Sequence, residues 1–447
     1  MQRMNHAKQV SILRELMRQL DAHENVDAGV MYKNPTSVYC CPEIAAKERE
    51  ILFQKHPQLI GLSADLPEPG SFMTIDDFGT PVLATRDTEG RFRAFLNACR
   101  HRGARVAEEA RGKSRRFICP FHNWTYACDG ELVGIPQREH FGEVDMACRG
   151  LLELPAEEKH GLLFVHPQRG GHLDVEELLG ELGPEIAEWK FGEGMIYQGE
   201  TLIERPLNWK LANDTFGETY HFAKLHKDTL GQVFHGDVLH YESFGRNHRF
   251  VIATRGIDRM RELPEEQWDM LQATSPLYFI FPNVQFTFGD GSTSLVKMYP
   301  HPTDPGQSIT RIAHYVSVEA VENARNAPES AYRVTSENVY DTERAGISED
   351  ERPIFDLSAT FEIFSSTIEK EDYRMGENQQ IAAANGTLDH VIFGRNEPAL
   401  HHYHRNFRDA LGMPPLEVYN PNEPASQAEK AIGTPLRAAK ERSMGAV

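Results

Sequence analysis

The chain has 447 residues, of which 40% are hydrophobic, and it carries a formal net charge of -19. This length predicts two domains with extensions, each large enough to bury a core of its own. The strong negative charge argues against a nucleic-acid-binding protein or one held on an anionic membrane, because both surfaces would repel it. The acidic surface by itself selects no substrate.

The N-terminal segment has no apolar stretch after its basic start, so it is not a secretory signal. No run of the chain approaches the roughly 20 apolar residues that a membrane span needs. Six cysteines in a chain of this length are too few for a disulfide scaffold. We therefore expect a cytoplasmic protein whose cysteines are metal ligands or buried thiols.

The first half of the chain changes from helical to β-like patterning. Apolar residues at helical spacing predict a helix over residues 7–23, and a second helix is expected over 42–54. From about 57 to 165 the chain shows short β-like runs separated by Gly, Pro, Asp and Asn, which are typical of an all-β domain. The runs lie at 72–76, 81–87, 92–98, 116–120 and 162–167.

The second half mixes helices with longer strands. Strands are expected at 278–283 and 284–288, and the Asp290-Gly291 pair predicts a hairpin turn into the next strand. The polar stretch 318–358 is expected to be helix and loop, and the tail from about 420 has the composition of a partly disordered segment. Further helices are predicted over 174–190, 208–230, 360–380 and 388–412.

The first group of candidate metal ligands reads Cys-x-His, a gap of 17 residues, and then Cys-x-x-His: Cys99, His101, Cys119 and His122. Three interpretations are open. The four residues could hold one structural zinc ion, or a [2Fe–2S] cluster with both cysteines on one iron and both histidines on the other, or they could coincide by chance. Two independent pairs argue against chance, and mixed pairs of this kind are unusual for zinc.

The residues around this group resemble a known family. The text RHRGA after the first cysteine and CPFHNWTYACDGEL from the second closely resemble the Rieske domains of aromatic-ring-hydroxylating oxygenases. The resemblance implies a Rieske [2Fe–2S] cluster bound by Cys99, His101, Cys119 and His122. The chain lacks the serine and the extra cysteines of high-potential Rieske proteins, so fewer hydrogen-bond donors to the cluster predict a lower potential.

Other positions in and around the cluster loops carry less information. Phe121 and Asn123 stand where the oxygenases usually have Tyr and Gly, and both departures leave the ligands intact. The remaining cysteines have no histidine at ligand spacing, so we expect structural roles for Cys40, Cys41, Cys128 and Cys148.

The second group lies in the segment NWKLANDTFGETYHFAKLH, residues 208–226. His221 and His226 are five residues apart and do not share a face of a regular helix, so both can reach one metal only if the helix is locally wound or ends between them. The segment resembles the mononuclear iron segment of the same family. The resemblance implies that both histidines belong to a 2-His-1-carboxylate triad on Fe(II), which leaves positions open for O2.

The third ligand must come from elsewhere in the chain. Residues 366–380 read STIEKEDYRMGENQQ, and the family places its aspartate ligand in a similar helix with a Glu-Asp pair followed by Glu-x-x-Gln. This resemblance implies Asp372 as the ligand, with Glu371 and Glu369 as competitors. A solvated acidic helix face is the alternative interpretation.

Glu218 lies three residues before His221. In the family a carboxylate at this place bridges a mononuclear-site histidine and the Rieske histidine of the neighbouring subunit, and it would couple the two sites. The dioxygenases usually have Asp there. Glu at this position is similar to some Rieske monooxygenases that act on quaternary amines.

The resemblance covers residues 38 to 412 approximately and implies an α+β fold. Its parts would be an N-terminal all-β Rieske [2Fe–2S] domain and a C-terminal helix-grip (START-like) catalytic domain, in which an antiparallel sheet wraps over a long helix. The expected organisation is an N-terminal helical extension (1–56), the Rieske domain (57–165), the catalytic mononuclear iron domain (166–420) and a C-terminal tail (421–447).

The resemblance also implies a function. The chain would be the terminal oxygenase component that uses O2 and electrons from NAD(P)H to hydroxylate or dihydroxylate an aromatic or hydrophobic substrate. A separate reductase, with or without a ferredoxin, would supply the electrons, since no GxGxxG motif follows a strand here. The family forms head-to-tail trimers, so we expect a homotrimer, with or without a beta subunit.

Three alternatives remain open at this stage. A Rieske monooxygenase or N-demethylase acting on an amine or alkyl substrate would use the same ligands. A non-catalytic Rieske electron carrier would need only about the first 165 residues. A zinc-stabilised binding protein would hold zinc in place of the cluster.

The substrate pocket is the least readable part of the sequence. The apolar residues near the ligand segments and the neighbouring strands are more often ordinary core than substrate contacts, although an apolar pocket would suit a hydrophobic substrate. The apolar candidates are Phe216, Phe222, Leu225, Phe281, Val284 and Phe286. The polar candidates are Asp214, His235 and His240.

Overall fold

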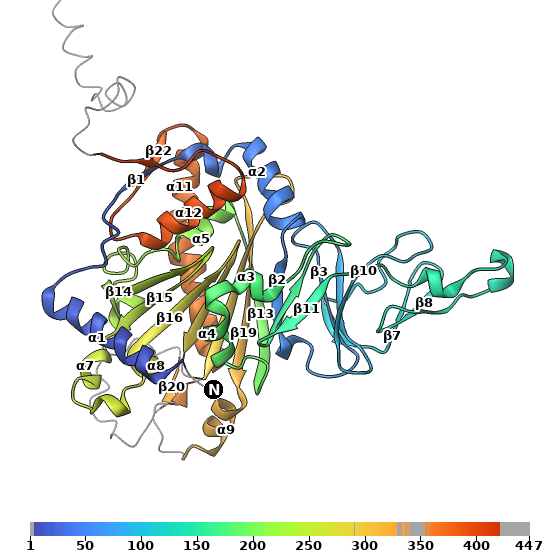
Figure 1. Ribbon diagram of the computed structural model, residues 1–447, viewed down its shortest axis with the longest axis horizontal. Helices are drawn as coiled ribbons and strands as arrows, with labels where there is room; N and C mark the ends of the chain where they lie inside the picture. The colour runs from blue at the N-terminus through green and yellow to red at the C-terminus, as the bar shows by residue number, and fades with distance from the viewer. Residues whose placement is uncertain are drawn as a thin grey trace, which may run out of the picture.

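The computed structural model describes residues 4–289, 291–328, 333–335, 338, 354–355 and 357–420. Figure 1 shows a β-rich arm that extends from a larger body built around one sheet. None of the helices within the described ranges is both long and apolar enough to span a bilayer. The predicted tail beyond 420 and most of the stretch 329–356 lie outside the described residues.

The arm runs from β2 (Gln58–Leu62) to β12 (Leu162–Val165) and contains three small antiparallel sheets. Their strand orders are β10-β5-β4-β3-β6, β11-β12-β2 and β7-β8-β9. Each of the five β-like runs read from the sequence contains a strand, so that part of the prediction is confirmed. The remaining bounds are β3 Ser71–Ile75, β4 Val82–Arg86, β5 Phe92–Leu96, β6 Arg111–Lys113, β7 Arg116–Ile118, β8 Thr125–Ala127, β9 Leu132–Gly134, β10 Glu153–Leu154 and β11 Ala156–Lys159.

The body contains a seven-stranded antiparallel sheet in the order β13-β19-β18-β17-β16-β15-β14. The expected strands at 278–283 and 284–288 fall in the β16–β17 hairpin, and the expected hairpin after residue 289 joins β17 to β18 with Gly289 opposite Ser292. Asp290 of that turn lies outside the described residues. The bounds are β13 Met195–Arg205, β14 Phe234–Phe244, β15 Asn247–Thr254, β16 Thr274–Ile280, β17 Val284–Gly289, β18 Ser292–Pro300 and β19 Ser308–Ser317.

Because strand side chains alternate, the sheet has two faces with different partners. One face packs against α1 (His6–Ala22) and the segment of α3 (Val175–Leu179) and α4 (Gly183–Glu188). The other face, which we call the inner face, carries Leu239, Phe250, Leu277, Val296 and Ile312 in one apolar cluster. It packs with α5 (Trp209–Asp214), α10 (Leu357–Thr367), α11 (Tyr373–Ala384) and α12 (Pro398–Ala410), and Figure 1 shows α5, α11 and α12 close together.

The sheet and its helices agree with the expected α+β fold, and the predicted helices over 7–23, 42–54 and 360–380 are present. The helix over 42–54 is α2 (Pro42–Glu48) continued by a π-helical turn, Arg49–Gln54. The region 174–190 is helical in short pieces, and the stretch 318–358 begins with α9 (Val318–Asn326).

One predicted helix differs from the structure, and one small sheet was not predicted. The helix expected over 388–412 is wrong at its start, because β22 (His390–Phe393) comes first and α12 begins at Pro398. The run His-Val-Ile-Phe contains β-branched residues that favour a strand. It pairs with β1 (Tyr32–Pro35), which also pairs with β23 (Glu417–Val418), so an unpredicted three-stranded sheet joins the N-terminal extension to the C-terminal segment.

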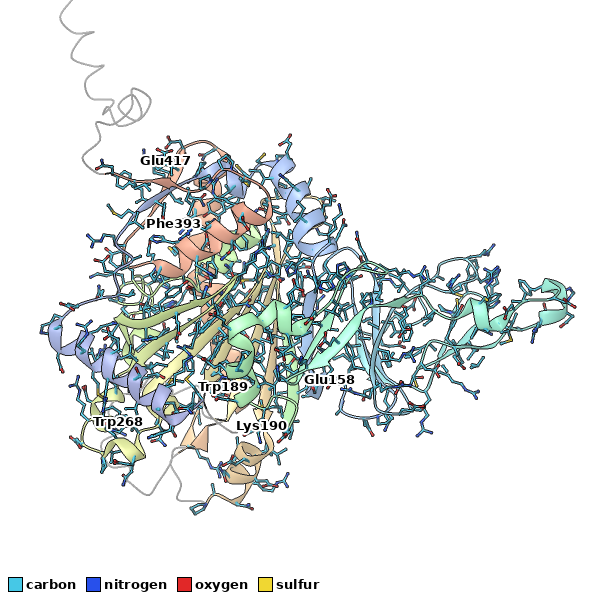
Figure 2. The ribbon with its side chains drawn as sticks, viewed as in Figure 1. Glu158, Trp189, Lys190, Trp268, Phe393 and Glu417 are labelled. Atoms are coloured by element: carbon cyan, nitrogen blue, oxygen red, sulfur yellow. The ribbon has the colours of Figure 1, made fainter. Side chains whose placement is uncertain are left out.

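Arm and body meet across a junction of hydrogen bonds, one of them to a buried carboxylate that forms an ion pair within the arm. Arg111 of the arm pairs with Asp65 at 2.6 Å, and the Tyr315 hydroxyl of β19 donates to Asp65 at 2.7 Å. The buried Lys297 of β18 donates to the Ile60 carbonyl at 2.9 Å. Figure 2 shows side chains filling this region, with Glu158 of β11 labelled on the arm side. The arm is therefore fixed to the body by specific contacts.

Candidate metal centres

The first centre lies on two loops of the arm. Cys99 and His101 follow β5, and Cys119 and His122 lie between β7 and β8. Each loop is closed by a backbone hydrogen bond from its cysteine, Cys99 N to the Ala104 carbonyl at 2.7 Å and Cys119 N to the Trp124 carbonyl at 2.9 Å. The two ligand pairs predicted from the sequence are therefore held by loops of similar construction.

Asn123 explains one departure from the family pattern. Its backbone has φ of +55°, in the left-handed region that most residues avoid. Asparagine tolerates this conformation better than most residues other than glycine. The Asn at the family's usual glycine position is therefore compatible with the same tight loop.

The four side chains present the donors that a Rieske cluster needs. The two free thiols are buried, and the rings of His101 and His122 lie 4.6 Å apart between centroids. The Nδ1 atoms of both histidines are buried without a hydrogen-bond partner. A buried polar atom without a partner is costly, so both nitrogens require one, and two thiolates with two imidazoles are the Rieske donor set.

Aromatic side chains surround the two histidines. The His101 ring stacks on Trp124 at 5.0 Å, with Phe141 edge-on at 5.6 Å. The His122 ring lies 3.8 Å from that of Phe121. Although the ligands themselves are recessed, Phe121 and Phe141 remain 55% and 42% exposed, so the arm ends in an apolar surface.

Sequence reasoning missed Tyr126, whose hydroxyl lies 3.3 Å from the Cys99 sulfur. That oxygen accepts the backbone N–H of Arg100 at 2.8 Å, which leaves its own hydrogen free to donate to the sulfur. The expectation of fewer donors counted the missing serine and overlooked this residue. The signal was available, because Tyr126 lies on β8 two residues after Trp124, which directly precedes the strand, and extended backbone places both side chains on one side.

The second centre is formed by His221, His226 and Asp372, whose ligand atoms lie within 4.8 Å of one another. The two Nε2 atoms are 3.1 Å apart, and Asp372 Oδ1 is 3.3 Å from that of His221 and 3.2 Å from that of His226. Three ligands bound at about 2.1 Å and at right angles would be about 3.0 Å apart. The observed triangle therefore fits one face of an octahedral ion, while the assignment of each ligand stays a prediction.

The charges around this triangle favour a cation at its centre. Burial by itself would lower the pKa of His221, but hydrogen bonds to Asp372 and Glu218 raise it to about 10. Burial likewise opposes a raised pKa at His226, where the hydrogen bond to Asp372 prevails. The carboxylates thus stabilise positive charge, and a divalent metal ion would take the place of the protons.

The NWK motif anchors the segment that carries the histidines. The Asn208 side chain accepts the Lys210 N–H at 2.9 Å and caps α5. Trp209 Nε1 donates to Glu48 at 2.9 Å, and Lys210 pairs with the same carboxylate at 2.7 Å. Glu48 is 1% exposed, so it is a buried anchor that sequence reasoning did not identify.

The predicted helix over 208–230 is wrong in extent. The helix α5 ends at Asp214, and both histidines lie in an irregular turn before the short α6 (Leu230–Val233). A side chain at Gly217 would come within 2.4 Å of Leu400 of α12, so the chain runs close to that helix there. The local winding is found instead at the third candidate ligand, since Asp372 ends a π-helical turn, Ile368–Asp372.

Contacts of α11 set Asp372 in register with the histidines. Gln380 accepts the Asn208 N–H at 2.9 Å and donates to the Tyr39 carbonyl at 3.2 Å. Among the competing carboxylates, Glu369 pairs with Arg205 at 2.7 Å, and Glu371 contacts the far nitrogen of His226. Asp372 therefore offers one oxygen to both Nε2 atoms. This geometry supports Asp372, rather than Glu369 or Glu371, as the predicted third ligand.

Glu218 lies against His221 in a surface groove. One oxygen is 2.5 Å from His221 Nδ1, and the other accepts the backbone N–H of His221 at 3.2 Å. The groove has a volume of about 870 Å³ and also includes Leu225 and Asp372. The candidate Asp214 lines it too, but its carboxylate is held by Tyr39 at 2.8 Å and by His404 at 2.9 Å.

The candidate pocket residues separate into two groups. Phe222 lies 5.0 Å from the His221 ring and 5.2 Å from the His226 ring, and it shares the inner-face cluster with Phe216. His235 has a buried Nε2 without a hydrogen-bond partner. The other candidates lie away from the ligand triangle: Val284 and Phe286 belong to the cluster on the opposite face of the sheet, His240 pairs with Val251 of that face, and Phe281 follows β16 and packs on Phe407 of α12. For the three apolar residues this agrees with the expectation that they are ordinary core.

Comparison with known proteins gives two family matches. Residues 56–149 match the Rieske [2Fe-2S] domain, and residues 192–413 match the ring hydroxylating alpha subunit (catalytic domain). The chain belongs to the Rieske non-haem iron oxygenase alpha-subunit family.

Individual relatives within this family differ in what they oxidise. The chain is 29% identical over 194 residues to the glycine betaine monooxygenase oxygenase subunit of Chromohalobacter salexigens, an alignment covering 43% of this chain and 42% of the relative. It is 29% identical over 201 residues to the anthranilate 1,2-dioxygenase large subunit of Acinetobacter baylyi, covering 44% and 43%. These alignments span less than half of each relative.

Solved structures extend the likeness over most of the chain. The quaternary ammonium Rieske monooxygenase CntA superposes with a TM-score of 0.67 at 18% identity, covering 86% of this chain and 96% of that one. At this identity the match shows a shared fold, with the arm and body in one chain.

Proposed function

We propose that this chain is the terminal oxygenase component of a system that inserts oxygen from O2 into an aromatic or other hydrophobic small molecule. The observation that carries the proposal is the presence of two different donor sets in one chain. The arm offers two thiols with two unpartnered imidazole nitrogens, and the body offers the His221, His226 and Asp372 triangle. A Rieske electron carrier alone would leave the second set without a purpose.

When bound, the cluster would supply electrons singly and the mononuclear iron would supply open positions for O2. The residues of the chain would divide the remaining work. Cys99, Cys119, His101 and His122 would hold the cluster, and Glu218 would fix the His221 ring through Nδ1 and leave Nε2 for the metal. A separate reductase, with or without a ferredoxin, would supply the electrons.

The substrate side is supported by the inner face of the sheet. Phe216, Phe222, Phe250 and Leu277 belong to one buried apolar cluster that includes the ring next to both candidate histidine ligands. An apolar lining favours a hydrophobic substrate. The second candidate function is monooxygenation or N-demethylation of an amine or alkyl substrate. Glu at position 218 favours it, as does the likeness to a glycine betaine monooxygenase subunit.

We further propose a head-to-tail homotrimer, with or without a beta subunit. Figure 1 places β7 and β8, which flank one cluster loop, at the end away from α5 and α11. The exposed Phe121 and Phe141 give that end an apolar surface, and the groove at Glu218 offers a hollow of about 870 Å³. The groove of one subunit would receive the arm of the next, and the Glu218 carboxylate would bridge the two centres.

Metal analysis combined with isotope labelling tests the proposal. The anaerobically purified protein should contain about three irons and two acid-labile sulfides per chain, and after reduction it should show a rhombic EPR signal with average g below 2. Reductase, NADH and 18O2 would then be supplied with naphthalene, with benzoate or with a tertiary amine. Labelled diols would support arene dioxygenation, and a labelled aldehyde with a secondary amine would support the second candidate. A colourless zinc protein would overturn both.

A further inference from the structure

The two candidate histidine ligands are held from outside by different carboxylates. His221 is 18% exposed and contacts Glu218 at the groove. His226 is 1% exposed, and its Nδ1 lies 2.8 Å from Glu371 Oε2. The bridging role proposed for Glu218 therefore has no counterpart at His226, and the function of Glu371 has to be explained separately.

Glu371 and Asp372 are consecutive residues that contact the two opposite nitrogens of one imidazole. Asp372 Oδ1 lies 3.2 Å from His226 Nε2, while Glu371 approaches Nδ1. Successive residues of a regular α-helix point about 100° apart. Here both residues belong to the π-helical turn Ile368–Asp372, whose wider backbone places the two carboxylates around one ring.

Thr229 completes this arrangement from the other side. Its hydroxyl donates to the same Glu371 oxygen at 3.0 Å, and its backbone N–H donates to the His226 carbonyl at 3.0 Å. The Glu371 oxygen therefore receives two hydrogen bonds from the turn that carries His226. These contacts join the turn to the π-helical segment at a point separate from the metal position.

We propose that Glu371 is a positioning residue that fixes the His226 ring with Nδ1–H outward and Nε2 toward the metal, and that Thr229 holds Glu371 in place. The inference rests on the proposed function, because it takes His226 as an iron ligand. A carboxylate on the far nitrogen sets the tautomer, orients the ring and makes the bound nitrogen more basic. Removing it should weaken metal binding without removing a ligand.

The test measures mononuclear iron affinity by competition with a chelator, in the full-length protein with its cluster in place. Glu371→Ala should raise the iron dissociation constant about 10- to 100-fold. Glu371→Gln, which keeps an acceptor but loses the charge, and Thr229→Val should raise it less. The matched control is Glu369→Gln on the same π-helical turn, because Glu369 pairs with Arg205 and should leave the constant unchanged.

A spectroscopic readout separates positioning from general stability. With Co(II) as the probe in place of iron, the visible ligand-field bands should shift in Glu371→Ala, move less in Glu371→Gln and stay unchanged in Glu369→Gln. The cluster absorbance reports folding of each variant. If Glu371→Ala fails to fold, the Gln and Val variants carry the test.

Each outcome bears on one claim. Unchanged iron affinity and cobalt spectra in the Glu371 variants would overturn the inference while leaving the proposed function intact. Complete loss of iron in Glu371→Gln, but not in Asp372→Asn, would overturn it by making Glu371 the ligand. If the His226→Ala variant instead held as much iron as the wild-type protein, this result would contradict the proposed function.

Discussion

The two candidate metal centres are built in opposite ways. On the arm, four ligands come from two short loops 17 residues apart, and the aromatic side chains beside them remain exposed. In the body, the third candidate ligand comes from a segment 146 residues beyond His226, and the ligands are recessed behind a groove. This difference suits the proposed roles, in which the arm would exchange electrons with partners through accessible loops and the body would shield the oxidation within distant elements.

The largest effects should come from removing one ligand of each centre. We expect His221→Ala to lose the mononuclear iron and all turnover while keeping the cluster absorbance. Cys119→Ser should lose the cluster and turnover while keeping iron in the body. Iron and sulfide counts with EPR check both variants. If either substitution emptied both centres, the two would not be independent.

Coupling between the centres should depend on Glu218. We expect Glu218→Ala to keep both metals but to lower turnover by about 10- to 100-fold, because the proposed bridge to the next subunit would be missing. Single-turnover experiments would compare cluster oxidation with product formation. The control is Glu242→Ala, an acidic residue of β14 paired with Arg249 away from the groove. Unimpaired single turnover in Glu218→Ala would remove the bridging role.

Lowering the pH should reduce the stability of the body through one buried histidine, His314. His314 hydrogen-bonds Ser294 at 2.8 Å and Ser365 at 3.2 Å, and burial lowers its pKa to about 4. The unfolded chain binds a proton at this residue near pH 6.5, so stability should fall as pH drops from about 6.5 to 4, by at most about 1.4 kcal/mol per pH unit. Unfolding by denaturant at several pH values should show a shallower slope for His314→Gln. An equal slope would exclude this group.

The smallest effect concerns the cluster potential. Tyr126→Phe should lower it by tens of millivolts, because the hydroxyl next to the Cys99 sulfur would no longer stabilise the reduced, more negative cluster. Spectroelectrochemical titration of the cluster measures this shift. The iron affinity of the body should not change, which would confirm that tuning of the arm is local.

The same contrast explains what the sequence could predict. Local patterns were sufficient for the strands of the arm and for grouping the Cys-x-His and Cys-x-x-His pairs, since residues close in sequence determine both. The histidine turn was misread as a helix, because Gly217 and its approach to α12 are tertiary effects. The role of Glu48 as the buried partner of Trp209 and Lys210 depends on a contact about 160 residues away, and no local pattern signals it.

The contacts between Arg111, Asp65 and Tyr315, with Lys297 beside them, fix the arm to the body. In the proposed trimer, an arm fixed in this way would present its cluster to the mononuclear iron of a neighbouring copy and not to that of its own chain. This dependence can be tested by mixing two variants. One variant lacks the cluster, the other lacks the mononuclear iron, and each is inactive alone. Turnover should return when the two are assembled into the same oligomer. Catalysis would then require the assembled ring of subunits. A single defective gene copy would therefore be expected to cause a partial, dominant loss of activity.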